Sequence, residues 1–447
     1  MDTPPPLDSP ARHPKLPPGF RPRRGLNWGV VGLMYTSYYL CRYNLTLANK
    51  AIADEFHFTK ADMSSIISAQ LFAYACGQII NGLLTDKLGG KRAMLIGAVG
   101  TVVMNLLFGA ASFWGMLWLF VVLRGLDGYS QAFGSPGFIK INAAWFSQTE
   151  RGTFAGIFGF MINLGRLGIF KLGPALLAGF TFLGMWQVPP LHWRWLFWIP
   201  AGVASLVAVV LALVVKDTPE EAGFHGVHKG ESDHDDADIR GEITTVFKQI
   251  VTNRVVWIIA AAYSCTGAVR QSIDQWFPRY LQEVQHLDMK STAFQITGFL
   301  IPFVASAGSL LSGYISDTVF QGRRAPVAAW VYGLEVGVIL VAAQAHSTAA
   351  IVTSFIMISF TANATHSLLG PAAAMDIGGR KMAGFASGVI DSFQYFGAAI
   401  ALKVLGWVLD ATGWTYFFYY MVPFGIIGGF LMYSIAHRRS LKKGHTH

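Results

Sequence analysis

The sequence is poor in charged residues, which fill only 13% of its 447 positions. Soluble globular domains use about 25%. Hydrophobic residues make up 53% of the chain, and apolar runs recur from Leu26 to His437 with only short polar breaks. A membrane span needs roughly 20 consecutive apolar residues. The composition therefore argues against a soluble protein and predicts a polytopic helical membrane protein.

Cysteine is also scarce. Cys41, Cys76 and Cys265 all lie within apolar runs, where cysteine behaves as a small hydrophobic residue. Three such residues build neither a disulfide framework nor a structural zinc site. The acidic run 231–238 lacks the glycine and the glutamate spacing of a calcium-binding EF-hand. We therefore expect no bound metal.

Motifs for ATP-driven or hydrolytic chemistry are missing as well. The chain has no Walker lysine loop and no nucleophile elbow, so we expect neither an enzyme nor a cofactor. Lys and Arg exceed Asp and Glu by 34 to 25, but the positive residues cluster where apolar runs end. No basic block has the aromatic interleaving of a single-strand binder, which argues against nucleic acid as a partner.

Hydropathy predicts twelve membrane spans in an all-α protein. The expected spans are 27–50, 62–85, 93–113, 115–143, 153–182, 194–215, 255–281, 292–316, 325–345, 348–374, 383–409 and 414–436. The polar stretch 216–254 is a cytoplasmic linker that divides them into bundles of six, at 26–215 and 255–437. The Pro-rich segment 1–25 lacks the apolar core of a signal peptide, so we expect a disordered cytoplasmic tail there. We expect a second, basic cytoplasmic tail at 438–447. Every second loop is basic, which predicts that both termini are cytoplasmic.

The two halves repeat their loop motifs. The segment from Asn81 to Arg92 follows the second span, and the segment from Ser312 to Arg324 follows the eighth; both contain G-x-x-x-D and a basic pair. After the fourth and tenth spans, a single arginine precedes two glycines. We expect the charged residues of these loops to control conformational switching: Asp86, Lys91, Arg92, Arg151, Asp317, Arg323, Arg324 and Arg380. Duplicated six-helix halves are typical of transporters whose site lies between the halves near the bilayer midplane. The Asp86 loop resembles the signature loop of the major facilitator superfamily.

Charged residues within the predicted spans are the strongest candidates for a site. Arg42 lies in span one and Arg270 in span seven, the corresponding helix of the other half. An arginine at the centre of a membrane helix costs roughly 2.5–3.5 kcal/mol on insertion scales, so such residues usually face a cavity. Two guanidinium groups can grip a phosphate or carboxylate. The alternative is that each is paired with an acid for structural reasons.

Longer segments resemble the organophosphate:phosphate antiporter family. They are YYLCRYN around Arg42, the run from Gly134 to Gly152, the helix end from Asp274 to Val284, and the run from Gly308 to Ala325. The resemblance implies the major facilitator fold, with two pseudo-symmetric six-helix bundles, and exchange across a bacterial inner membrane.

The resemblance also implies roles for particular residues. It implies that Arg42 and Arg270 bind the phosphoryl group, and it places Tyr35 and Tyr39 on the cavity wall, where they could hydrogen-bond an anion or stack on substrate carbons. As plain interface aromatics, the two tyrosines would need no function.

The chain departs from the family pattern at Gln78, Ile162 and Asp391. A lysine expected in span two is Gln78, and a histidine expected in span five is Ile162, beside the matching Asn163. Asp274 lies one turn after Arg270, and Asp391 stands where the family has a neutral tyrosine. The two acids cancel the two arginines, which raises the alternative of a zwitterionic substrate whose amine meets Asp391.

Other ionisable residues compete for these roles. Lys140, Arg166 and Lys171 would restore positive potential if they faced the cavity. Arg124 and Asp127 resemble a superfamily motif linked to proton coupling, but could equally pair and lock span four. His366 in span ten is either a packing residue or a substrate ligand.

These observations predict a secondary transporter that works by alternating access. We expect exchange of an organophosphate, or of a related small anion or zwitterion, for inorganic phosphate, by a monomer in the lipid bilayer. The alternatives are a proton-coupled symporter of a small organic solute and a transporter-like receptor for a sugar phosphate.

Overall fold

The computed structural model describes residues 17–146, 151–182, 185–225 and 252–436, and only the backbone of 151–158, 182 and 371–387. The first half contains α1 (Phe20–Arg42), α2 (Asn44–Phe56), α3 (Lys60–Leu88), α4 (Gly90–Ala110), η1 (Ala111–Phe113), α5 (Leu117–Gln131), α6 (Gly134–Trp145), α7 (Arg151–Ala178), β1 (Phe180–Phe182), β2 (Trp186–Val188), α8 (Trp195–Val214) and η2 (Glu220–Ala222). The second contains α10 (Arg254–Glu283), α11 (Thr292–Thr318), α12 (Arg324–Ala343), α13 (Thr348–Leu369), α14 (Pro371–Thr412), η3 (Gly413–Tyr416), η4 (Tyr419–Met421) and α15 (Val422–Ala436).

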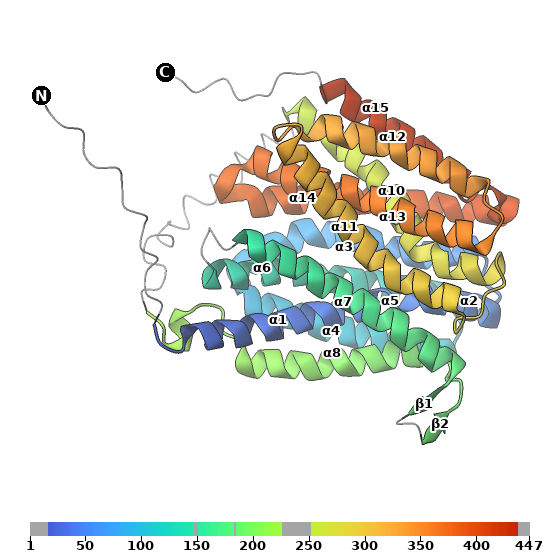
Figure 1. The fold of residues 1–447 in the computed structure, drawn as a ribbon. Coiled ribbons are helices and arrows are strands. Elements are labelled where there is room, and N and C mark those ends of the chain that lie inside the picture. Colours follow the sequence, from blue (N-terminus) through green and yellow to red (C-terminus); the bar gives the residue numbers. More distant parts are fainter. Residues whose placement is uncertain (1–16, 147–150, 183–184, 226–251, 437–447) are drawn as a thin grey trace, which may run out of the picture.

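The helices make twelve passes through one bundle (Figure 1). Within the described residues, nine helices are long and apolar enough to cross a membrane by themselves. The other three passes are α1 with α2, α5 with α6, and α10. The helices of the first two passes are interrupted and α2, α5 and α6 are each shorter than 18 residues, while α1 and α10 contain the buried charges of Arg42, Arg270 and Asp274.

Several boundaries differ from the sequence expectation. The first helix begins at Phe20, inside the expected tail, because Phe20 is fully buried; residues 1–16 and the tail from 437 lie outside the described residues. Span four is not one helix, since the chain breaks at Ala132 and Phe133, ahead of a Gly-Ser-Pro sequence that starts α6. Helix α14 begins at Pro371 rather than at 383, because proline is well suited to the first turn.

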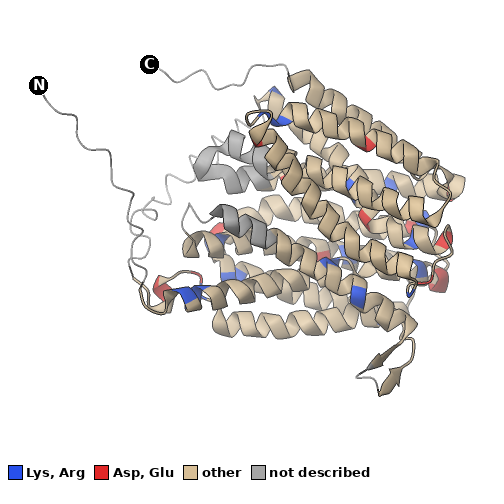
Figure 2. Ribbon diagram, viewed as in Figure 1, with Lys and Arg blue, Asp and Glu red and all other residues tan. Residues whose placement is uncertain are grey.

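The start of α1 and the end of α15 lie at the same end of the bundle, on the left of Figure 1, which we call the terminal end. The opposite, far end carries α2 and the antiparallel hairpin of β1 and β2, in which Phe180 pairs with Val188. Hydropathy did not predict this hairpin. In Figure 2, most of the helical surface is uncharged, and charged residues gather near the two ends with a few inside the bundle.

The two halves meet along three helix pairs: α3 with α14, α7 with α11, and α2 with α10. One continuous core of buried apolar side chains extends across this interface. Small residues permit the close approaches between helices. At Gly267 of α10, an added Cβ would lie 2.1 Å from the carbonyl oxygen of Gln394 in α14, so a side chain there would push the two helices apart.

Candidate functional site

Arg42 lies at the end of α1 and is buried, with 6% of its surface exposed. Its guanidinium carbon sits 4.7 Å from the ring centre of Tyr39 and 4.3 Å from that of Tyr74. Its Nε donates to Oε1 of Gln131 at 2.8 Å. The aromatic faces and this hydrogen bond fix the direction of the guanidinium group.

The break between α1 and α2 holds the backbone of Arg42. Tyr43 leaves the helical conformation there, so the last carbonyls of α1 lose their helical partners. Arg124 of α5 binds two of them: its Nη2 donates to the carbonyl of Arg42 at 2.6 Å, and its Nη1 to that of Cys41 at 3.3 Å. Arg124 also pairs with Asp127 at 3.1 Å. The structure thus places Arg124 and Asp127 together, behind Arg42.

Arg270 lies in the middle of α10 and is also buried, with 8% exposed. Its Nη1 is 3.2 Å from Nδ1 of His366 in α13, and that nitrogen is 2.6 Å from the hydroxyl of Tyr263. The side-chain amide of Gln394 fits its neighbours when its oxygen faces Arg270 and its nitrogen faces Asp391. In this orientation it accepts from Nη1 of Arg270 at 2.8 Å and donates to Oδ1 of Asp391 at 3.1 Å. Arg270, His366 and Asp391 thus belong to one polar group.

Asp274 joins the halves. Its Oδ1 pairs with Nη2 of Arg166 in α7 at 2.6 Å, and its Oδ2 accepts from the hydroxyl of Tyr43 at 3.3 Å. Arg270 is a weaker partner, with Nε at 4.0 Å. Asp274 lies one turn after Arg270 in the sequence and could pair with it, but its closest contact in the structure is Arg166, from the other half.

The two arginines of the prediction lie in one cross-interface cluster. Arg42 lies over the ring of Tyr39, which stacks on Tyr43 with 6.0 Å between ring centres. The hydroxyl of Tyr43 donates to Asp274, and Asp274 lies 4.0 Å from Arg270. The rings of Tyr74 and Tyr395, from opposite halves, are 4.6 Å apart. The cluster therefore surrounds the place where α1, α3, α10 and α14 meet. We call it the arginine cluster; its members are Arg42, Arg166, Arg270, Asp274, Asp391, His366, Gln131, Gln394, Tyr39, Tyr43, Tyr74, Tyr263 and Tyr395.

The other predicted site residues lie nearby on the same helices. Tyr35 is buried one turn before Tyr39, with their rings 5.6 Å apart. Gln78 is buried on α3. Asn163 of α7 donates to Ser306 of α11 and so bridges the two halves.

The predicted switching residues lie at the terminal end. Asp86 is mostly exposed and has Nζ of Lys140 at 3.7 Å, while the backbone amide of Lys91 donates to Asp217 at 2.6 Å. Arg92, Asp317 and Arg323 are exposed, and Arg324 is half-buried. Arg151 and Arg380 fall in α7 and α14, but their side chains lie outside the described residues.

Polar contacts close the far end between the halves. Arg279 of α10 donates through Nη1 to Oδ1 of Asn49 in α2 at 2.9 Å and pairs with Glu283. Oε2 of Glu283 accepts from Nε1 of Trp414 at 2.8 Å and lies 3.7 Å from Nζ of Lys60 in α3. We call these residues the far-end contacts.

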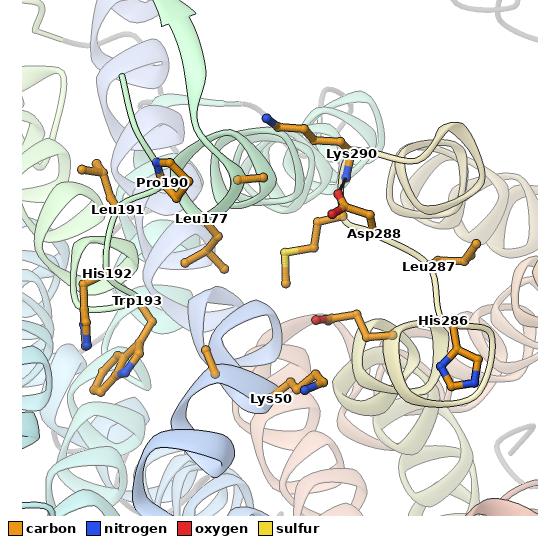
Figure 3. A pocket seen from close by; sticks show the side chains of 14 residues that line it. Lys50, Leu177, Pro190, Leu191, His192, Trp193, His286, Leu287, Asp288 and Lys290 are labelled. Atoms are coloured by element: carbon orange, nitrogen blue, oxygen red, sulfur yellow. Dashed lines mark hydrogen bonds between the residues drawn. The ribbon is translucent and has the colours of Figure 1, made fainter. Parts of the chain in front are cut away.

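An open cavity of about 860 Å³ lies outside these contacts. It is lined by the middle of α2, the end of α7, the segment before α8 and the end of α10 with the loop that follows it, so both halves form it. Figure 3 shows Lys50, His192, His286 and Lys290 around its opening. None of the residues of the arginine cluster lines this cavity. The residues of the far-end contacts do not line it either, and we call this cavity the vestibule.

Sequence reasoning missed the residues that orient the arginines. Gln131, Gln394, Tyr74, Tyr263 and Tyr395 carry no charge, and the sequence has many similar residues in its spans. Arg166 was foreseen only as one of three additional cations. Of the other two, Lys140 turns to the carbonyl of Asp86 at 2.6 Å and Lys171 to Gln295 at 3.1 Å, both away from the cluster.

Comparison with known proteins agrees with this architecture. The chain is 28% identical over 402 residues to a probable hexose phosphate transport protein of Chlamydia pneumoniae, covering 86% of this chain and 85% of the relative. It is 26% identical to a glycerol-3-phosphate transporter of Bacillus subtilis, over 89% and 86% of the two chains. It is 29% identical to the membrane sensor protein UhpC of Escherichia coli K12, over 87% of each. These relatives support the resemblance found in the sequence.

Solved structures show the same fold. A bacterial homolog of the human lysosomal transporter Spinster, inward-facing and occupied, superposes with a TM-score of 0.73 at 14% identity, over 93% of this chain and 97% of that one. Its unoccupied form gives 0.70 at 15% identity, over 93% and 96%. The family model described as Major Facilitator Superfamily matches residues 31–402. With most of its length covered by this match, the chain is an integral membrane protein that belongs to the Major Facilitator Superfamily.

Proposed function

We propose that the protein is a secondary transporter that exchanges an organophosphate for inorganic phosphate. The observation that carries the proposal is the arginine cluster, in which buried Arg42 and Arg270 come from opposite halves and are linked through the tyrosines and Asp274 at the interface between the halves. The relatives named as glycerol-3-phosphate and hexose phosphate transporters support this substrate class. Arg42 and Arg270 bind the phosphoryl group, with Tyr39 stacked on Arg42.

Charge supports an anionic rather than a neutral substrate. Arg166 adds a third guanidinium group to Arg42 and Arg270, against the carboxyl groups of Asp274 and Asp391. The cluster therefore keeps one formal positive charge even with both acids ionised. In addition, the buried Nε groups of Arg166 and Arg270 have no hydrogen-bond partner within the described residues. A bound phosphate would compensate the charge, and such compensation is needed for a buried cation.

Asp391 gives the cluster a second kind of contact. It accepts from Tyr263 at 3.1 Å and from Gln394, and these polar groups stand beside His366. Such groups suit the hydroxyl or amine groups of a substrate whose phosphate lies on the arginines. The proposed substrate is therefore a phosphate ester whose other part carries hydroxyl or amino groups.

We further propose how the chain moves and how it is oriented. The bundles 26–215 and 255–437 rock against each other across the linker 216–254, in a monomer. The terminal end faces the cytoplasm of a bacterial inner membrane, since Lys and Arg favour cytoplasmic loops. On this assignment the far-end contacts close the outer side, so the arginine cluster opens inward in this state, and Asp86, Lys91, Arg92, Asp317, Arg323, Arg324, Arg151 and Arg380 lie at the inner side.

The test is transport by Arg42→Lys and Arg270→Lys in proteoliposomes loaded with phosphate. An ammonium group cannot reproduce the planar fork of guanidinium, so each variant should lose counterflow of labelled phosphate while expressing and unfolding like the wild type. Near-normal exchange in either variant would reject the assignment.

A receptor is the second candidate, because the chain is equally similar to a protein named as a membrane sensor. A receptor would bind phosphate esters in a thermal-shift assay without any counterflow. Proton-coupled symport of a small organic solute is the third candidate. Asp127, in the motif that would carry the proton, accepts hydrogen bonds from Arg124, Gln131, Asn105 and Gln70. Uptake driven by a pH gradient without internal phosphate would identify this activity.

A further inference from the structure

The sequence pattern around Arg124 and Asp127 is not used by the proposed substrate contacts. Neither residue belongs to the surface that meets the substrate: each has only 1% of its surface exposed. Both nevertheless connect to Arg42, Arg124 through its backbone and Asp127 through Gln131. What these connections do to Arg42 follows from their geometry.

Gln131 is locked in one orientation. Its Nε2 donates to both carboxylate oxygens of Asp127, at 3.1 and 3.0 Å. Turning the amide over would point its oxygen at the carboxylate, which is repulsive. The oxygen Oε1 must therefore face Arg42, where it accepts from Nε at 2.8 Å.

Asp127 is itself held on several sides. Nη1 of Arg124 lies 3.1 Å from Oδ2, Nδ2 of Asn105 lies 3.2 Å from Oδ1, and Nε2 of Gln70 lies 3.3 Å from Oδ2. These donors come from three helices, α3, α4 and α5. The carboxylate that orients Gln131 is thus fixed to the body of the first half.

Because the amide of Gln131 is neutral, its contact leaves the positive charge of Arg42 uncompensated. A carboxylate in direct contact with Arg42 would neutralise it and compete with a substrate anion. With Gln131 between them, Asp127 orients the guanidinium through a hydrogen bond at Nε. The two terminal nitrogens, which make the fork that suits a phosphate, take no part in this hydrogen bond.

The second half repeats this chemistry. Gln394 accepts from Nη1 of Arg270 and donates to Asp391. Arginine, glutamine amide and aspartate therefore follow each other in both halves. The two aspartates differ in exposure, since Asp391 is half-buried and Asp127 is fully buried.

We propose that Arg124, Asp127 and Gln131 are positioning residues for Arg42, with Arg124 fixing the end of α1 and the Asp127–Gln131 pair fixing the guanidinium group. The inference rests on the proposed function, since it assumes that Arg42 binds the phosphoryl group. Its prediction is that Gln131 controls anion affinity without touching the anion.

Gln131→Leu tests the proposal, with Gln70→Leu as a matched control. Both glutamines are buried, with 1% and 3% exposed, and both donate to Asp127. Only Gln131 reaches Arg42. Because hydrogen bonds to charged groups are stronger than neutral ones, Gln131→Leu should weaken phosphate binding by about ten- to a hundredfold, and Gln70→Leu by less than about threefold. Titration calorimetry with inorganic phosphate on the purified full chain measures both.

A second comparison separates positioning from folding. Gln131→Met and Gln70→Met keep more of the volume, so they serve if either leucine variant fails to fold. In an Arg42→Lys background, Gln131→Leu should cause no further loss, because the two residues act through one contact. Equal losses for the Gln131 and Gln70 variants, or additive losses in the double variant, overturn the positioning role. Normal phosphate binding by Arg42→Lys alone overturns the proposed function instead.

Discussion

A substitution at Asp274 tests how the positive charges of the arginine cluster are compensated when no substrate is bound. Its carboxylate contacts Arg166 at 2.6 Å and lies 4.0 Å from Arg270. In the absence of substrate it therefore acts as an internal anion, which allows the empty cluster to close. Asp274→Asn keeps the size and one oxygen acceptor but removes this charge.

The magnitude follows from the extra charge. An uncompensated arginine in the membrane interior costs roughly 2.5–3.5 kcal/mol, and about 1.4 kcal/mol corresponds to a factor of ten. Switching of the empty Asp274→Asn carrier should therefore slow by about a hundredfold. Switching with phosphate bound should change little, because the phosphate supplies the missing negative charge.

Proteoliposomes measure the two processes separately. Uptake of labelled phosphate into phosphate-loaded vesicles reports exchange, and uptake into vesicles without phosphate reports the return of the empty carrier. We expect the ratio of exchange to net uptake to rise about a hundredfold, by the same conversion of free energy to rate. Asp274→Glu, which retains the charge, should keep the wild-type ratio.

The double variant Arg166→Gln/Asp274→Asn provides the matched control. It removes one charge of each sign, so the net charge of the cluster returns to that of the wild type. Its ratio should therefore fall back toward the wild-type value. The reasoning is refuted if Asp274→Asn and the double variant give the same ratio, or if Asp274→Asn slows exchange as much as net uptake.

Two further predictions concern other parts of the fold. Arg279→Gln should destabilise the closed far end, because Arg279 joins Asn49 to Glu283. A cysteine placed at Ala53, near these contacts, should then react faster with a membrane-impermeant thiol reagent. An unchanged rate would show that these contacts do not hold the end closed. Gly267→Ala should lower the thermal stability and slow transport, because the added methyl group meets the backbone of Gln394 and overpacking costs about 1–3 kcal/mol; wild-type melting and exchange would contradict the packing argument.

The sequence predicted the fold well because insertion of a helix into a membrane depends on the length and hydrophobicity of each local segment. Twelve passes, two halves and a central polar site all follow from apolar length, repeated loops and arginines in spans. Breaks within passes were harder to predict, since hydropathy averages over them. The α5–α6 break before Gly134 and the start of α14 at Pro371 depend on single residues.

The candidate site was predicted through its charges and missed through its neutral residues. Arg42 and Arg270 stood out because an arginine in a span is rare. Gln131 and Gln394 did not, because their importance lies in which neighbours they touch. The partner of Asp274 could not be predicted either: Arg270 is one turn away in sequence, but Arg166 reaches the same carboxylate from the other half with better geometry.

The far-end contacts also determine where the electrical field of the membrane falls. Along α10, Asp274 and Glu283 are nine residues apart, or about 14 Å at the helical rise, compared with roughly 30 Å of hydrocarbon. If water fills the vestibule on one side and enters the arginine cluster from the terminal end, as the proposed inward opening requires, the voltage drops mainly over this short layer. A transported anion then experiences its main electrical work, up to about 2.3 kcal/mol per charge at 100 mV, in the single step that opens these contacts.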